Sequence, residues 1–138
     1  MERIVVGVDG SQGSRDAMAW AVDEARRRNA VVEAIYAWHQ PFVGGYAEMG
    51  EMGLGDYDAE AEGILEETVA AVDTTGVTVE RHVIPGRPSQ VLVEESKGAS
   101  LLVIGSRGRG GFAGLLLGSV SQQAAHHAPC PVVIIPPS

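Results

Sequence analysis

The sequence predicts an α/β protein, namely a five-stranded parallel doubly wound sheet with helices on both faces, in one domain that spans residues 1–138. Three observations predict this class. Short apolar segments alternate four times with segments of helical periodicity, and the chain closes on another apolar segment. Runs such as Leu101-Leu102-Val103-Ile104 are continuously apolar, which is typical of parallel strands buried on both faces. The 138 residues, 45% of them hydrophobic, suffice for one core.

The elements follow from these patterns in chain order. The expected strands lie at residues 4–8, 31–38, 77–84, 101–104 and 132–135. Apolar residues at helical spacing predict a first helix before residue 29, a second from about 61 that closes near 76, a third from 88 that residue 98 terminates, and a last from about 120 that residue 129 stops. Ser11 or Ser14 can cap the first helix, Asn29 can end it, and Pro88 suits the first position of the third. The glycine-rich segment 39–56 is expected to be a long irregular loop.

Charge is distributed unevenly along the chain. The net charge is −8, which argues against general binding to nucleic acid or to anionic membranes. All 18 acidic residues lie at or before Glu95, whereas the segment 96–138 carries Lys97, Arg107 and Arg109 and no acid. The last third of the chain is therefore its locally positive part, as an anion site would require. The single cysteine, Cys130, and the lack of a signal-peptide pattern predict a cytoplasmic protein.

The segment 105–119 is glycine-rich and joins an expected strand to an expected helix. Such connections hold phosphate, because glycine lets backbone N–H groups approach oxygens and a helix start adds unpaired donors. A P-loop is excluded because Lys97, the only lysine, lies outside that motif. A dinucleotide fingerprint is excluded because it belongs after the first strand and needs a later acidic residue. An empty loop remains the simplest alternative.

Position in the fold also predicts a site. Ligands of doubly wound sheets sit beyond the carboxyl ends of the strands, where the strand order reverses. The first strand ends near Asp9, the second near Ala37 and the fourth at Gly105. We expect these ends to converge on one crevice. Asp9 could instead only form an Asx turn, and Ser119 could only cap the last helix.

Three separated segments resemble one family. The pattern G-x2-G-x9-G-[ST] is met by Gly105, Gly108, Gly118 and Ser119. Together with Val5-Val-Gly-Val-Asp-Gly-Ser11 and Cys130-Pro-Val-Val-Ile-Ile-Pro136, it makes the whole chain resemble the universal stress protein family. The resemblance implies a Rossmann-like domain of the adenine nucleotide α-hydrolase type, of the kind that binds ATP. It also implies a stress-response module that forms a homodimer through the last strand, 132–135.

The resemblance assigns roles to individual residues. Asp9 would contact the ribose or adenine end, and the backbone of Ala37 would recognise adenine. Gly105 and Gly108 would approach the ribose and phosphates. Phosphate would be bound by the backbone N–H groups of Gly118, Ser119 and Val120, at the start of the last helix. The hydroxyls of Ser119 and Ser121 would add further donors. Arg107 and Arg109, in the loop, are either solvated or in contact with phosphate.

Other functions stay open at this point. Slow Mg-dependent ATP hydrolysis is an alternative, although the sequence shows no catalytic set, and another adenine nucleotide such as cyclic AMP could be the ligand. We expect no metal site formed by protein side chains. His126 and His127 are adjacent and would point apart on a helix, while His39 and His82 are distant in sequence. The expected ligand is therefore ATP, with or without Mg, and no nucleic acid or membrane is expected as a partner.

Overall fold

The computed structural model describes residues 1–38, 54–107 and 117–137. Its elements, in chain order, are β1 (Arg3–Gly7), α1 (Gln12–Arg28), β2 (Val31–Trp38), α3 (Leu54–Ala70), β3 (Val79–Pro85), α4 (Pro88–Glu95), β4 (Leu101–Gly105), α5 (Ser119–His127) and β5 (Val132–Ile135). The five strands form one parallel sheet in the order β3-β2-β1-β4-β5. The predicted fold class is confirmed.

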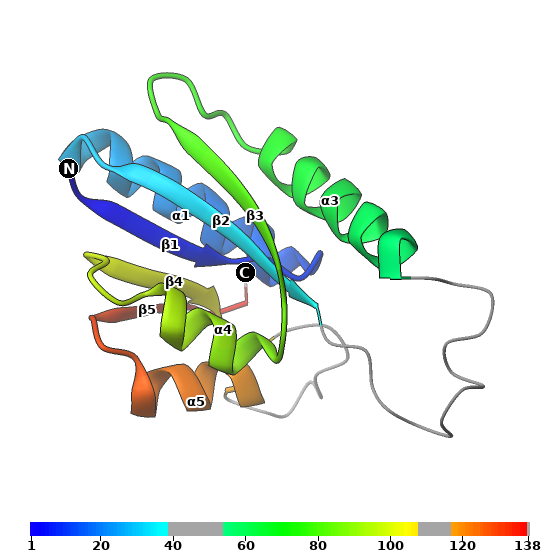
Figure 1. Ribbon diagram of the computed structural model, residues 1–138. Coiled ribbons are helices and arrows are strands. Elements are labelled where there is room, and N and C mark those ends of the chain that lie inside the picture. The colour runs from blue at the N-terminus through cyan, green and yellow to red at the C-terminus, as the bar shows by residue number, and fades with distance from the viewer. Residues whose placement is uncertain (39–53, 108–116, 138) are drawn as a thin grey trace.

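Helices cover both faces of the sheet, as Figure 1 shows. Helices α1 and α3 pack together on one face, and α4 and α5 pack together on the other. The chain places β2 and β3 on one side of β1 and then returns, through α4, to place β4 and β5 on the other side. Because of this reversal the switch point lies between β1 and β4.

Each face has its own apolar core. Ile4 and Val6 of β1 face α1 and α3, whereas Val5 faces α4 and α5. All three are fully buried, because a central strand of a doubly wound sheet has helices on both sides. This is why the run at the start of the chain is continuously apolar rather than alternating.

Local signals fix the helix ends. Ser11 is the N-cap of α1, and its hydroxyl accepts a hydrogen bond from the Ser14 N–H at 3.2 Å. Asn29 ends this helix in the left-handed conformation, with φ of 58°, which asparagine tolerates better than most residues. Pro88 is the first residue of α4, where its missing N–H costs no helical bond. These predictions from the sequence are confirmed.

Some boundaries differ from the predictions. Helix α3 begins at Leu54, so the predicted loop 39–56 is wrong at its last three residues, and its remainder lies outside the described residues. Strand β3 starts at Val79 rather than at residue 77, because residues 74–77 form a turn closed by a bond from the Val77 N–H to the Thr74 carbonyl. Among the described helices, none combines the length and the hydropathy that crossing a bilayer would require.

Candidate functional site

The candidate site lies at the carboxyl ends of β1 and β4, which are neighbours in the sheet. Strand β2 flanks β1 on its other side, so the three strand ends that the sequence singled out belong to adjacent strands. Asp9 follows β1 by two residues, Ala37 is the penultimate residue of β2, and Gly105 is the last residue of β4. The structure thus brings these three predicted residues together at the carboxyl-terminal end of the sheet, beside the switch point.

At this end of the sheet, the backbone of the first turn of α1 lies close to the backbone at the end of β4. A Cβ atom added to Gly105 would lie 3.0 Å from the carbonyl carbon of Gly13 and 3.2 Å from its Cα. A Cβ added to Gly13 would lie 3.0 Å from the carbonyl oxygen of Arg107. Both positions therefore favour glycine, because the neighbouring backbone would have to give way to a side chain. Gly13 was not among the residues predicted from the sequence, where a glycine in the first turn of a helix was the only available signal.

The two ends of the glycine-rich connection are hydrogen-bonded to each other. The Gly118 N–H donates to the Ser106 carbonyl oxygen at 2.6 Å, and the Ser106 N–H donates to the Ile135 carbonyl at 2.8 Å. The buried hydroxyl of Ser121 lies 2.9 Å from the carbonyl oxygens of both Gly105 and Ser106. Whatever path residues 108–116 take, these bonds fix the start of α5 beside the end of β4.

This arrangement changes two of the predicted roles. The N–H of Gly118 is already used by the Ser106 carbonyl, so it is not one of the donors available to a phosphate. The Ser121 hydroxyl points into the protein and anchors α5 to β4, so it is a positioning group rather than a phosphate ligand. Sequence alone could not show this, because a serine in the first turn of a helix can face either way.

The remaining donors belong to the first turn of α5. The first hydrogen bond within this helix runs from the Gln122 N–H to the Gly118 carbonyl, at 3.0 Å. The N–H groups of Ser119, Val120 and Ser121 consequently have no acceptor within the helix. Ser119 is exposed, and it is the first helical residue rather than the cap, which is Gly118. Together with the helix dipole, these groups form an arrangement suited to an anion.

Asp9 forms the Asx turn that the sequence left open as an alternative. Its Oδ1 accepts hydrogen bonds from the N–H of Ser11 at 2.9 Å and from the Ser11 hydroxyl at 2.5 Å. Asp9 and Arg107 are both half-buried, and Val120 packs against the α4–α5 core. Gly108 and Arg109 lie outside the described residues. The turn orients the Asp9 carboxylate near the carboxyl ends of the strands.

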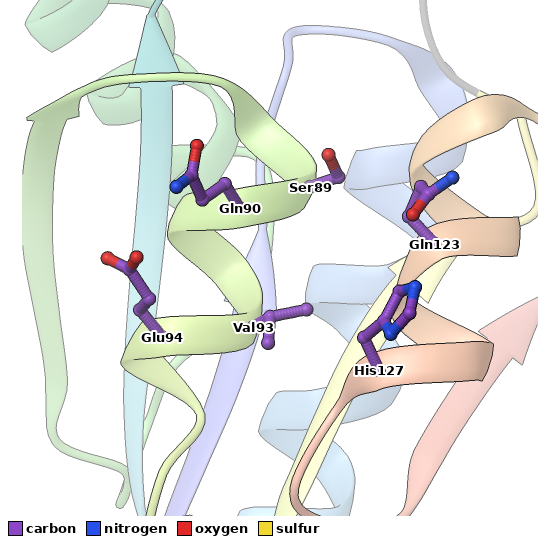
Figure 2. Close-up of a pocket in the computed structure, with 6 residues that line it drawn as sticks. All are labelled: Ser89, Gln90, Val93, Glu94, Gln123 and His127. Atoms are coloured by element: carbon purple, nitrogen blue, oxygen red, sulfur yellow. The ribbon is translucent and has the colours of Figure 1, made fainter.

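A hollow of about 270 Å³ lies between α4 and α5. It is lined by Ser89, Gln90, Val93, Glu94, Gln123 and His127. Figure 2 shows that Val93 points toward α5, and the other five lining residues are all polar. None of the predicted site residues lines this hollow, and its volume is smaller than that of most small-molecule pockets. We therefore place the candidate site at the carboxyl ends of β1, β2 and β4.

Comparisons with known proteins agree with this fold. The sequence profile of the universal stress protein family matches residues 1–136. Universal stress protein Rv2623 of Mycobacterium tuberculosis is 40% identical over 133 residues, which are 95% of this chain and 44% of that protein. This chain therefore spans less than half the length of that relative.

Solved structures show the same architecture. The universal stress protein UspA from Lactobacillus plantarum superposes with a TM-score of 0.80 at 22% identity, covering 97% of each chain. A universal stress protein described as a complex with cAMP is 30% identical, with a TM-score of 0.63, and the match covers 97% of this chain and 95% of that one. With the family profile matching nearly the whole chain, this protein belongs to the universal stress protein family.

Proposed function

We propose that this chain is a nucleotide-dependent regulatory module that binds an adenine nucleotide, with ATP as its ligand, at the carboxyl ends of β1, β2 and β4. The observation that carries the proposal is the position of α5. The Ser121 hydroxyl and the Gly118 N–H hold the start of this helix against the end of β4. Donors of the first turn of α5 therefore lie at the switch point, where an anionic ligand is expected.

The proposed roles combine this geometry with the roles that the family resemblance implies. The N–H groups of Ser119 and Val120 and the Ser119 hydroxyl would bind phosphate, with Arg107, Gly108 and Arg109 contributing from the loop. Asp9 would contact the ribose or adenine end, and the Ala37 backbone would meet adenine. The complex of the 30% identical relative with cAMP supports an adenine nucleotide as the ligand class. Binding would shift the population toward one conformation, which is how a nucleotide would control a partner.

The first experiment identifies the ligand. The freshly purified chain is denatured by heat, and the released small molecules are measured by mass spectrometry. About one ATP per chain would support the proposal. If nothing is released, the chain is titrated with ATP and with cAMP, with and without Mg²⁺, while its thermal midpoint is followed. Failure of every adenine nucleotide to raise the midpoint would overturn the proposal, and Mg-dependent release of phosphate would show slow hydrolysis.

We further propose that the chain is a cytoplasmic homodimer that pairs through β5. This strand is at the edge of the sheet, and its four apolar residues are all only partly buried. An exposed apolar edge strand is a template for pairing with a second chain. Sedimentation at micromolar concentration is expected to give a dimer, which Val133→Lys should convert to a monomer. A wild-type monomer would rule this pairing out, and Val79→Lys on the opposite edge strand is the control.

A further inference from the structure

A group of charged side chains lies on the sheet far from the candidate nucleotide site. Glu33 of β2 and Glu80 of β3 are directly opposite each other in the parallel register. His82 is two residues beyond Glu80, so it lies on the same face of β3. The side-chain ligand atoms of these three residues all lie within 4.8 Å of one another. Because Glu80 is the second residue of β3, this group lies toward the amino ends of the strands, opposite the candidate nucleotide site.

One ring nitrogen of the His82 imidazole, Nε2, is buried without a hydrogen-bond partner among the described residues. The same atom lies 3.6 Å from Glu80 Oε1 and 3.9 Å from Glu33 Oε2, too far for hydrogen bonds. A buried polar atom without a partner is costly and is often explained by an ion or a water. Here it is directed toward two carboxylates that carry like charge across neighbouring strands.

Arg3 already occupies the other side of Glu33. Its Nη1 donates to Glu33 Oε1, and its guanidinium also contacts the carbonyl oxygens of Glu95 and Lys97. This leaves Oε2 as the Glu33 oxygen that faces His82. Carboxylates that bind metals are commonly oriented by such a hydrogen bond on their other oxygen. Strand alternation places Arg81 on the opposite face, so it does not compete for this position.

We propose that Glu33, Glu80 and His82 form a binding site for one divalent transition-metal ion, best suited to Zn²⁺. One imidazole nitrogen and two carboxylate oxygens are a donor set that Zn²⁺ accepts, whereas Mg²⁺ favours oxygen ligands in octahedral geometry. Ligand atoms about 2.1 Å from a tetrahedral zinc are roughly 3.4 Å apart, so the 3.6 and 3.9 Å separations need only small side-chain shifts. The two carboxylates balance the ionic charge, and solvent completes the coordination.

The ion would join the edge strand β3 to β2. Helix α4 packs against β1 and β2, and in Figure 1 it lies clear of the amino-terminal half of β3. The Glu80 and His82 side chains are 51% and 42% exposed, so a small shift of these side chains opens the His82 Nε2 atom to an ion from solvent. Because the group lies at the opposite end of the strands from Asp9, its occupancy is separate from nucleotide binding. The metal-site proposal therefore stands or fails independently of the proposed function.

Zinc binding to the full chain tests the proposal. The background variant His39→Asn, His126→Asn, His127→Asn leaves His82 as the only histidine. After chelator treatment, it is titrated with Zn²⁺ in competition with a chromophoric chelator. We expect one ion per chain, and we expect His82→Asn or Glu80→Gln to weaken binding at least tenfold. The exposed Glu62→Gln on α3 is the matched control and should leave the affinity unchanged.

Two further measurements distinguish the loss of the metal site from unfolding of the variant. Zn²⁺ should raise the thermal midpoint of the background variant but not of the same variant carrying Glu80→Gln, whose midpoint without metal should be unchanged. Co²⁺ in the site should show the visible absorption of a low-coordinate nitrogen and oxygen environment. The proposal is overturned if Glu80→Gln binds Zn²⁺ as tightly as the background variant, if binding disappears with His126 and His127, or if Mg²⁺ displaces Zn²⁺ at equal concentration.

Discussion

Ser119→Pro is expected to weaken adenine-nucleotide binding by about 100-fold while leaving the fold intact. Ser119 is the first residue of α5, a position where proline fits a helix without losing a helical hydrogen bond. The preceding Gly118 has φ of −76° and ψ of 173°, which is the conformation that a residue before proline prefers. The substitution therefore removes one backbone donor and one hydroxyl from the proposed phosphate site and nothing from the helix ladder.

Ser119→Ala separates the two contributions. It removes the hydroxyl alone and should cost about tenfold, since a hydrogen bond to a charged group is worth about 1.5–3 kcal/mol and about 1.4 kcal/mol is one factor of ten. The proline variant adds the loss of the N–H. Affinities are measured by calorimetric titration with ATP, and thermal midpoints of both variants should match that of the unmodified chain, because Ser119 is exposed.

Gln12→Pro supplies the matched control. Gln12 is the first residue of α1, it is exposed, and its N-cap Ser11 has a similar backbone, with φ of −79° and ψ of 163°. If α5 holds the phosphate, Gln12→Pro should bind ATP normally. An equal loss in the two proline variants, or full affinity in Ser119→Pro, would contradict the assignment of phosphate to the start of α5.

Gly105→Ala is expected to destabilise the chain by about 1–3 kcal/mol, the usual cost of forcing extra atoms into a packed region. The added methyl group would meet three backbone atoms of Gly13 at 3.0–3.2 Å. Backbone cannot move aside as a side chain can, so the start of α1 must shift away from the end of β4. Asp9 and the start of α5 lie at the same end of the sheet as Gly105, so nucleotide affinity should fall as well.

Gly63→Ala is the comparison that isolates this contact. Gly63 lies within α3, and a Cβ there would meet no described atom within 4 Å beyond its chain neighbours and the backbone of its own helix. Replacing a helical glycine in open space by alanine should stabilise the chain by about 0.5–1 kcal/mol. Urea unfolding of both variants gives the two free energies of unfolding. If Gly105→Ala were as stable as the unmodified chain, the close approach of α1 and β4 would not be a real constraint.

Several features of this protein were determined by its sequence alone. The apolar run Leu101-Leu102-Val103-Ile104 predicted a strand buried on both faces, and its four residues are buried alternately in the two cores. Asn29 and Pro88 carry conformational preferences of their own, so the helix ends they predict need no tertiary information. The glycine pattern from Gly105 to Ser119 predicted a strand before it and a helix after it, and these are β4 and α5. Local preferences and hydrophobic periodicity suffice for such features.

Other features were decided only by the tertiary structure, because they depend on which residues lie side by side across elements. The contact of Gly13 with Gly105 follows from the way α1 crosses the end of β4. The inward direction of the Ser121 hydroxyl follows from the acceptors that β4 offers. The register of β2 against β3 brings Glu33 next to residues 47 and 49 positions later in the chain. Sequence periodicity fixes the face of a strand, but pairing between strands fixes its neighbours.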